Sequence, residues 1–269
     1  MSLTGPIEAP ASQSMNLQNQ LETTAHNLAN ATTVGYKRRV NVFAAALARQ
    51  LAGGGQAAND GQVVNDSLSD TLGAGNVAPS DFRQQAATMS QQIDFTQGPL
   101  QRTDRPLDLA LHGKGFFVLE SPDGLTYTRN GQFRLNRLNQ LVDTSGRLVA
   151  GTEGPITVPQ NISPSEVQIN AAGEVIAGDQ PLGTLRLASF ADTRVLRPAG
   201  DSGFRAPPDV RPSAATDCAV RRGHLEQSNV KTVPEMVNLI EVTRMYEANM
   251  KSIRTADDRV KNLLQVAMS

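Results

Sequence analysis

The chain has 269 residues, with 25 Lys and Arg against 26 Asp and Glu, so its formal net charge is −1. That balance argues against nucleic acid or an anionic membrane surface as a partner. The length allows one large domain or two smaller ones, and the lack of tryptophan, with only 4% aromatic residues, argues against a large small-molecule pocket.

Targeting and redox signals are sparse. Residues 1–10 contain no basic cluster followed by an apolar stretch, so we expect no cleaved secretory signal. The sequence has no run of about 18 apolar residues, so we expect no direct membrane insertion. Cys218 is the only cysteine, which excludes an internal disulfide. These features predict a chain that is cytosolic or exported by a route that needs no such signal.

The N-terminal region is expected to be helical over residues 11–31. Leu17, Leu21 and Leu28 fall on one three-four row, while Ser14 and Thr24 fill that row only weakly. A following glycine, Gly35, accepts the left-handed backbone that closes a helix. A second amphipathic stretch covers residues 40–51. Residues 53–88 lack large apolar residues and any sustained period, which predicts a linker.

The middle of the chain alternates in the manner of β-strands. Strands are expected at 107–111, 115–120, 126–128, 132–135, 140–143, 156–158, 167–170, 174–177 and 184–190. Residues 122–124 (PDG) predict a turn, and Asn130 with Gly131 predicts a hairpin. Strands at this spacing favour a small antiparallel sandwich or barrel.

A long apolar seam marks the C-terminal region. Thr232 and Glu235 form a capping-box pattern that starts a helix, with Pro234 in its first turn. From residue 239 apolar residues recur at steps of three and four, which is the spacing of one stripe along a helix. Its members, of which only Asn249 is polar, are Leu239, Val242, Tyr246, Asn249, Ile253, Ala256, Val260, Leu263 and Ala267.

These elements predict an α+β fold. Long N- and C-terminal helices pack together in a coiled-coil-like manner, and a central antiparallel β-rich domain lies between them in sequence. The expected regions are an N-terminal assembly helix region at 1–52, a flexible linker at 53–95, the β-rich domain at 96–196, a connector at 197–231 and a C-terminal assembly helix at 232–269.

Three sequence segments resemble one known family in the correct order. Residues 25–37 (AHNLANATTVGYK) are similar to the N-terminal signature of the bacterial flagellar rod and hook proteins. The C-terminal signature of that family is matched by LEQSNV at 225–230, EMV at 235–237 and RMYEAN at 244–249. The central segments PLDLA at 106–110, GKGFF at 113–117 and YTRNGQF at 127–133 resemble the sheet domain of the rod proteins.

The resemblance implies an axial component of the flagellar basal body, most like the proximal or distal rod proteins. It implies export in unfolded form by the flagellar type III apparatus, terminal helices packed into a tube around the export channel, and partners that are copies of this chain and other rod and hook proteins. The chain departs from the family pattern at His26, Tyr36 and Asn139, where asparagine, phenylalanine and glycine are common.

The expected function is therefore a structural shaft subunit that transmits torque, without cofactor, metal or small-molecule substrate. The expected assembly interface comprises Leu17, Leu21, Leu28, Asn30, Leu239, Val242, Tyr246, Asn249, Ile253, Val260 and Leu263. Asn249 either sets the register of the seam or is a solvated break in it. Asn27 and Asn30 either bond across the helix contact or are polar residues near a helix end.

Other functional classes find less support. His26, His112 and His224 are scattered, with no cysteine or carboxylate at ligand spacing, so catalysis is not expected. The glycine pattern at 73–78 follows no strand, and the 113–115 segment (GKG) lacks the rest of a phosphate loop. The alternative is a surface adhesin or binding module, in which a helical stalk forms a discrete oligomer and the β domain is the head.

Overall fold

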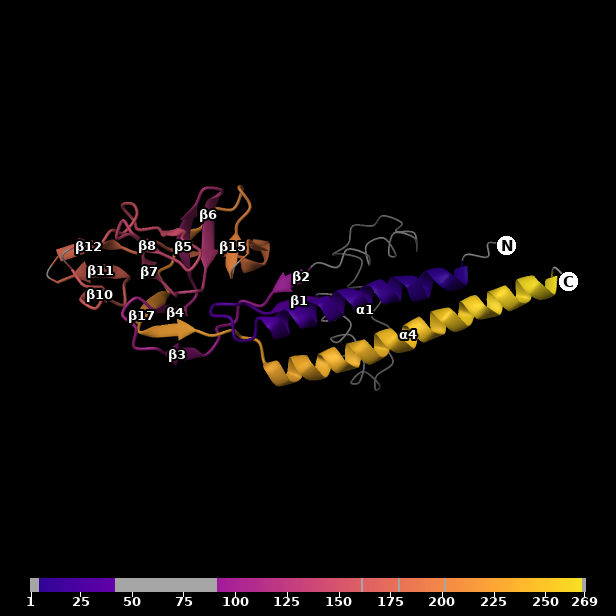
Figure 1. Ribbon diagram of the computed structural model, residues 1–269. Helices are drawn as coiled ribbons and strands as arrows, with labels where there is room; N and C mark the ends of the chain where they lie inside the picture. Colours follow the sequence, from indigo (N-terminus) through magenta and orange to yellow (C-terminus); the bar gives the residue numbers. More distant parts are fainter. Residues whose placement is uncertain (1–4, 42–90, 161, 179, 201, 268–269) are drawn as a thin grey trace, which may run out of the picture. The chain divides into compact units, whose positions relative to one another are not determined.

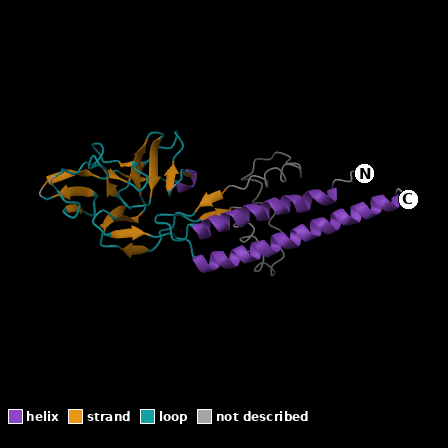
Figure 2. Ribbon diagram, in the orientation of Figure 1, coloured by secondary structure: helices purple, strands orange, loops and turns teal. Residues whose placement is uncertain are grey.

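The computed structural model describes residues 5–41, 91–160, 162–178, 180–200 and 202–267 (Figure 1). Its two α-helices are α1, Gly5–Ala29, and α4, Thr232–Ala267; one 3-10 turn, η1, spans Thr193–Val195, and the remaining regular elements of these ranges are strands (Figure 2). The predicted linker at 53–95 lies outside the described residues except for 91–95, which include the strand β2, Gln91–Ile93. The glycine pattern at 73–78 and most of the second amphipathic stretch also lie outside the described residues.

The prediction of two long helices packed as a coiled coil is wrong. α1 has 25 residues against 36 in α4, and the two helices are joined by hydrogen bonds between polar side chains. Asn238 Nδ2 donates to Thr24 Oγ1 at 3.0 Å, and Asn249 Nδ2 donates to Ser14 Oγ at 2.9 Å. Small hydroxyl side chains therefore occupy α1 positions where a coiled coil needs large apolar knobs.

The strands of the described chain pair antiparallel throughout and form five sheets, of two to nine strands, rather than one sandwich or barrel. They are β1 Arg39–Asn41, β2 Gln91–Ile93, β3 Leu100–Arg102, β4 Leu109–Gly113, β5 Phe116–Ser121, β6 Gly124–Thr128, β7 Arg134–Leu135, β8 Leu141–Val142, β9 Leu148–Val149, β10 Val167–Ile169, β11 Glu174–Ala177, β12 Gln180–Thr184, β13 Leu187–Ser189, β14 Arg197–Pro198, β15 Gly203–Arg205, β16 Ser213–Ala214, β17 Cys218–Arg222 and β18 His224–Glu226.

The largest sheet has nine strands. Seven of them run in the order β14-β15-β6-β5-β9-β8-β7, and β13 pairs with both β5 and β16. β10, β11 and β12 form a second sheet, while the pairs β1-β2, β17-β4 and β18-β3 are two-stranded. The last two pairs connect strands far apart in sequence, so the segment before α4 is held by β3 and β4. We call the part of the chain that contains β3 to β18 the β region.

The turn at residues 122–124 is confirmed, because Ser121 pairs with Gly124 and joins β5 to β6. The hairpin predicted at Asn130 and Gly131 is wrong, since β7 pairs with β8 and not with β6. Asn130 Oδ1 instead accepts from the backbone N–H of Gln132 at 3.0 Å. A side chain at Gly131 would place its Cβ 1.7 Å from the carbonyl oxygen of Leu109, so glycine serves here for close backbone approach.

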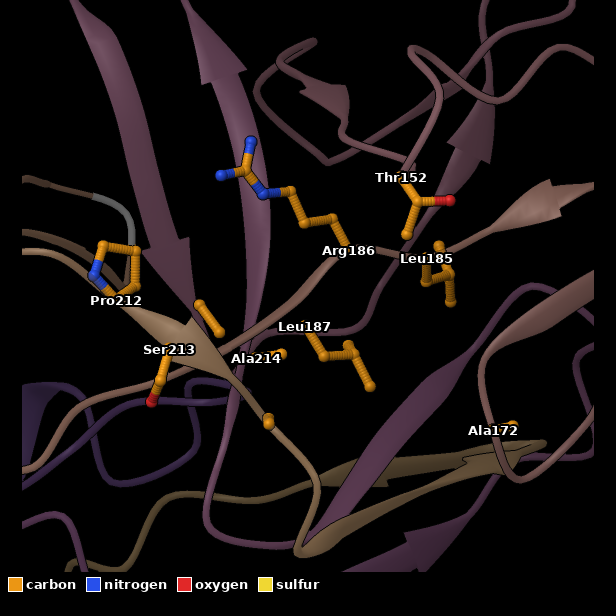
Figure 3. Close-up of a pocket in the computed structure, with 10 residues that line it drawn as sticks. Thr152, Ala172, Leu185, Arg186, Leu187, Pro212, Ser213 and Ala214 are labelled. Atoms are coloured by element: carbon orange, nitrogen blue, oxygen red, sulfur yellow. The ribbon is translucent and has the colours of Figure 1, made fainter.

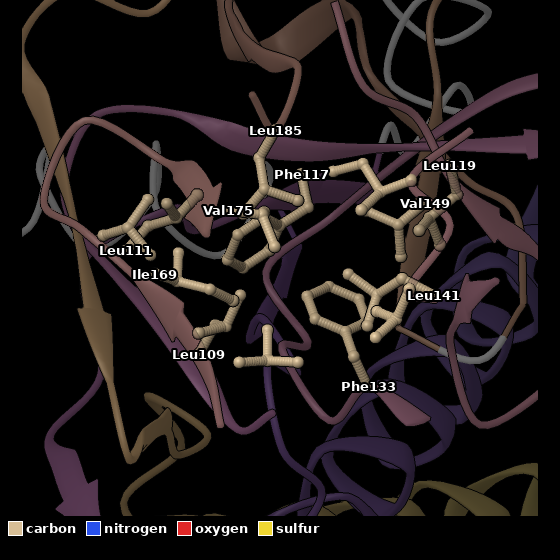
Figure 4. Close-up of a cluster of buried hydrophobic side chains, with 14 residues drawn as sticks. Leu109, Leu111, Phe117, Leu119, Phe133, Leu141, Val149, Ile169, Val175 and Leu185 are labelled. Carbon is tan, nitrogen blue, oxygen red and sulfur yellow. The ribbon is translucent and has the colours of Figure 1, made fainter. Parts of the chain in front are cut away.

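The core lies among the sheets. β5 is buried on both faces, as its continuous apolar run predicts: Phe117 is fully buried in the main cluster, and Phe116 packs edge-on to Phe204 at 6.1 Å between ring centroids. Phe117 and Phe133 also meet edge-on, at 5.1 Å. Figure 4 shows this cluster, which includes Leu109, Leu111, Phe117, Leu119, Phe133, Leu141, Val149, Ile169, Val175 and Leu185.

The segment 197–231, expected to be a connector, contains the five strands β14 to β18. Its proline and arginine content suggested irregular structure, but short two- and three-residue strands tolerate proline at sheet edges. β17 alone pairs five residues with β4, from Cys218 opposite Gly113 to Arg222 opposite Leu109. This segment is therefore part of the sheet structure that leads into α4.

Candidate assembly surface

A buried carboxylate ties together three distant parts of the chain. Glu226 Oε1 accepts from Lys37 Nζ at 2.6 Å and from the backbone N–H of Gly98 at 2.9 Å, and Glu226 Oε2 accepts from Arg129 Nη1 at 3.2 Å. The side chains of Lys37 and Glu226 are completely buried. We call Lys37, Gly98, Arg129 and Glu226 the Glu226 clasp.

The clasp fixes the segment that follows α1. The backbone N–H of Gly35 donates to the carbonyl of Glu226 at 2.8 Å. Gly35 has a φ of 69°, and a Cβ there would lie 2.4 Å from the backbone nitrogen of Asn130. The helix ends at Ala29, so Gly35 is not its terminating residue as expected. It allows the chain after α1 to press against the β region.

Burial and charge compete at Lys37. Burial disfavours the ammonium and lowers the pKa of Lys37 below its ordinary value, while the adjacent Glu226 carboxylate raises it in part. Arg129, the second cation of the clasp, also donates from Nη2 to the carbonyl of Gly113 at 2.8 Å and lies 5.2 Å from the ring centroid of Phe116. The Glu226 carboxylate is thus the counter-ion of two buried cations, Lys37 and Arg129. Removal of that carboxylate would leave both cations without a counter-charge.

A second set of contacts joins the same segment to the start of α4. The backbone N–H of Arg38 donates to Asn229 Oδ1 at 2.8 Å, and Arg38 Nε pairs with Glu235 Oε1. Asn229 Nδ2 donates to the carbonyls of Asp94 and Thr96, at 2.8 and 3.1 Å. α4 begins at Thr232, as predicted, but the Glu235 carboxylate reaches Arg38 across the junction.

The asparagines of the N-terminal signature bond within their own segment. Asn27 is buried and its Oδ1 accepts from the Tyr36 hydroxyl at 3.0 Å, while Asn30 Nδ2 donates to the carbonyl of His26 at 2.9 Å. His26 Nδ1 lies 3.0 Å from the same Tyr36 hydroxyl. These contacts hold the segment 30–36 against the last turn of α1. The Asn30 side chain therefore bonds to His26 and Thr33 of its own segment and not across the helix pair.

The structure brings some of the predicted interface residues together, but it buries few of them. Leu17 and Val242 are buried, and Val242 is fully so. The side chains of Val260 and Leu263 lie outside the described ones. Asn249 contacts Ser14 and is therefore more than a solvated break in the stripe. The members that keep partial exposure are Leu21, Leu28, Asn30, Leu239, Tyr246, Asn249 and Ile253.

A second apolar row on α4 faces away from the buried seam. Ile240 and Val242 are two residues apart, which places them about 200° apart around a helix. Ile240 is 53% exposed, whereas Val242 is 0% exposed. We call the exposed row the outer stripe; its members, spaced three and four apart, are Val233, Met236, Val237 and Ile240. This row was not predicted from the sequence, because its members precede or fall off the longer seam that begins at Leu239.

A groove continues along α4 beyond the outer stripe. It has a volume of about 570 Å³ and is lined by Tyr246, Glu247, Met250, Lys251 and Arg254. Its apolar members come from the seam side and its charged members from the solvent side of the helix. The first part of α4 thus exposes bare apolar surface, and the next part exposes apolar surface edged by charge.

Among the described residues the structure contains no group of three or more His, Cys, Asp or Glu that would hold a metal ion. No described helix is both long enough and apolar enough to cross a membrane. A hollow of about 410 Å³ opens beside β13 and β16 (Figure 3). Most of its ten lining residues are small or aliphatic, such as Leu185, Leu187 and Ala214. Arg186 is the one titratable residue among these ten.

The segments that form the clasp and α4 match known protein families. The family described as "Flagella basal body rod protein" matches residues 12–37, "Flagellar hook protein FlgE/F/G D1 domain" matches residues 110–177, and "Flagellar basal body rod FlgEFG protein C-terminal" matches residues 221–266. The flagellar basal-body rod protein FlgG of Buchnera aphidicola subsp. Acyrthosiphon pisum is 33% identical over 257 residues, which cover 90% of this chain and 92% of that protein.

The chain belongs to the family of flagellar basal-body rod proteins. Rod protein FlgF of Salmonella typhimurium is 33% identical over 275 residues, covering 96% of both chains. Rod protein FlgG of Agrobacterium fabrum is 34% identical over 251 residues, covering 90% and 91%. The resemblance seen in the sequence is confirmed, and the protein is a structural rod subunit.

The rod-protein signatures contain all three side chains of the Glu226 clasp. Lys37 ends the N-terminal segment, Arg129 lies in the central segment, and Glu226 lies in the first part of the C-terminal one. None of the three was predicted to have a role, because the sequence does not show which charges meet in a folded core. Their presence in three separate signatures was the one signal that pointed to a common site.

Proposed function

We propose that this rod subunit assembles with copies of itself and with other flagellar axial proteins through the outward side of α4. The outer stripe carries this proposal, since it places four large apolar side chains in solvent on one side of a helix that matches the C-terminal rod family. Full burial of a side chain of this size contributes about 1.5–3 kcal/mol. A contiguous exposed row of this kind is typical of a protein–protein contact.

The Glu226 clasp supports the same proposal. A subunit that carries load between its neighbours needs its contact helix fixed to the rest of the molecule. The clasp and the Arg38–Glu235 pair hold the start of α4 against the segment after α1 and against the β region. In the proposed rod, force applied to α4 passes into the β region through these buried bonds.

The finer features belong to the same proposal, and membership of the rod family supports them. The subunits form a tubular shaft that transmits torque and encloses the export channel, within the part of the basal body that spans the periplasm. The chain reaches that place through the flagellar type III export apparatus, without a cleaved signal peptide. Contacts that repeat head to tail without closing produce an open filament of this kind. The role is structural rather than catalytic.

The adhesin alternative predicts a discrete oligomer instead of an open one. The rod-family matches at both ends and in the centre favour the shaft. Electron microscopy of the concentrated protein separates the two classes: short tubes are expected for the rod subunit, whereas compact trimers would support the adhesin.

The test of the α4 surface is incorporation into basal bodies. Ile240→Glu is introduced in cells that lack the native copy, and basal bodies are purified and probed for the chain. We expect at least a tenfold loss of incorporation, together with loss of motility, while circular dichroism shows a folded protein. The matched control is Leu138→Glu, since Leu138 is 71% exposed on the β region. Equal incorporation of both variants would contradict the proposal.

A further inference from the structure

Two arginines lie directly opposite each other at one edge of the nine-stranded sheet. β14 is the last strand of that sheet, and its register with β15 pairs Arg197 with Arg205 and Pro198 with Phe204. Phe204 is buried and its ring centroid lies 5.0 Å from that of Phe95. Because side chains alternate along a strand, the two arginines lie together on the face opposite Phe204.

Such a pair is unfavourable without an anion nearby. Directly opposed residues in antiparallel strands have Cβ atoms about 4.5–5.5 Å apart, and like charges there repel. Arg205 Nη2 lies 3.8 Å from Asp123 Oδ2, a loose contact between two exposed groups. Arg197 forms no ion pair with any described residue, and Asp192, five residues earlier in the sequence, pairs with Arg194. Asp209, which follows the groove in sequence, has no ion pair within the described chain either.

Both arginines line a groove together with proline and alanine residues. The groove has a volume of about 590 Å³ and is lined by Arg197, Pro198, Ala199, Arg205, Ala206, Pro207 and Pro208. Val210 N–H donates to the carbonyl of Pro207 at 3.0 Å, which closes a turn at the end of the groove. Proline walls lose little conformational freedom on binding.

The edge itself does not suit strand addition. Pro198 has no backbone N–H to donate, and a proline on an edge strand blocks pairing with a further strand. Recognition at this edge must therefore come from side chains. A guanidinium group binds a carboxylate through two parallel N–H···O bonds, so two adjacent guanidinium groups suit closely spaced carboxylates.

We propose that the Arg197–Arg205 groove binds an acidic segment of a neighbouring protein, with Asp or Glu carboxylates held between the two guanidinium groups. The proline rings would cover the apolar part of the same segment. The site lies on the β region and is independent of the outer stripe of α4, so it is a second contact of the subunit.

The test uses the full-length chain and a fluorescently labelled hexaglutamate peptide, with anisotropy as the readout at low salt. Arg197→Gln with Arg205→Gln is expected to lower the affinity at least tenfold and to weaken its salt dependence. The control, Arg137→Gln with Arg221→Gln, removes the same charge from exposed arginines elsewhere, and we expect a change of less than about twofold. Unchanged thermal melting of both variants shows that the fold is intact.

Three results would overturn the proposal. Equal binding by the wild type and the Arg197/Arg205 double variant would show that the groove does not hold the peptide. Equal binding of hexaglutamate and hexaglutamine would show that charge is not recognised. Displacement of the peptide by inorganic phosphate at a lower concentration than by unlabelled hexaglutamate would show a site for free anions instead of a protein segment.

Discussion

Glu226 accepts a hydrogen bond from Lys37, which lies 189 residues away in sequence, at 2.6 Å with both side chains fully buried. This contact joins the segment after α1 to the strand that leads into α4. Arg129, from the β region, bonds to the second oxygen of the same carboxylate. The two ends of the chain and its centre are therefore coupled through one side chain.

Replacement of Glu226 is expected to be severely destabilising. Glu226→Gln leaves Lys37 and Arg129 buried without a counter-charge, and the loss of one partner from a buried pair costs about 3–5 kcal/mol. Urea denaturation measures the change in the free energy of unfolding. Glu153→Gln, at an exposed position, is the control and is expected to stay within about 0.5 kcal/mol of wild type. A small effect at Glu226 would mean that the clasp does not stabilise the fold.

The pH dependence of stability tests the burial of Lys37. Burial lowers the pKa of Lys37 below its ordinary value of 10.5, so the unfolded chain keeps this proton to a higher pH than the folded chain does. Stability rises with pH wherever the unfolded state binds more protons. The contribution of Lys37 to the free energy of unfolding should therefore increase from the folded-state pKa up to 10.5.

The measurement compares wild type with Lys37→Met by urea denaturation at increasing alkaline pH. The comparison is needed because burial raises the pKa of Tyr127 and of Cys218, which lowers stability as these groups lose protons at high pH. Those two contributions are common to both proteins and cancel in the difference. The wild type should gain stability relative to Lys37→Met as the pH rises; a constant or falling difference would contradict the burial of a charged Lys37.

Gly35 is expected to tolerate no side chain. Gly35→Ala introduces a Cβ 2.4 Å from the Asn130 nitrogen at a φ of 69°, so both the clash and the backbone strain oppose it. The cost should clearly exceed the roughly 1–2 kcal/mol expected for the left-handed backbone alone. Gly146→Ala is a matched control, because its φ is 86° but nothing lies within 4 Å of its Cβ position. Equal losses in thermal stability would show that the approach to Asn130 is not tight.

Substitutions along the seam of α4 should differ in how much they lower the free energy of unfolding. Val242 is fully buried, and Val242→Ala removes about two methylene equivalents and leaves a small cavity, at a cost of about 2 kcal/mol. Ile253 is only partly buried, so Ile253→Val should cost less than about 0.5 kcal/mol in the isolated chain. Equal losses per methylene would indicate the evenly packed coiled coil that the structure does not show.

The sequence predicted the elements whose signals are local. The start of α4 was readable from Thr232 and Pro234, and β5 was readable from four consecutive apolar residues at 116–119. Asn139 has a left-handed backbone, with a φ of 56°, which is consistent with the glycine that the sequence resemblance implied at this position. Each of these features depends on neighbours within a few residues.

Features that depend on contacts between residues distant in sequence were either not predicted or predicted wrongly. Asn130 and Gly131 carry the strongest hairpin signal, yet they do not form a hairpin. The backbone of Leu109 instead packs closely against Gly131. The coiled-coil prediction treated Ser14 and Thr24 as weak places in an apolar row, whereas they bond to Asn249 and Asn238 of α4. The Glu226 clasp joins residues 98, 129 and 226 to Lys37. The periodicity of apolar residues in the sequence does not indicate contacts of this kind.

The most direct test of assembly through α4 is site-specific cross-linking in native basal bodies. A photoreactive p-benzoylphenylalanine is placed at Ile240 in the outer stripe and, for comparison, at Leu138 on the β region. After irradiation, Ile240 should give covalent adducts with neighbouring axial subunits in high yield. Adducts at Leu138 alone, with Ile240 unreacted and open to solvent in assembled basal bodies, would contradict the account.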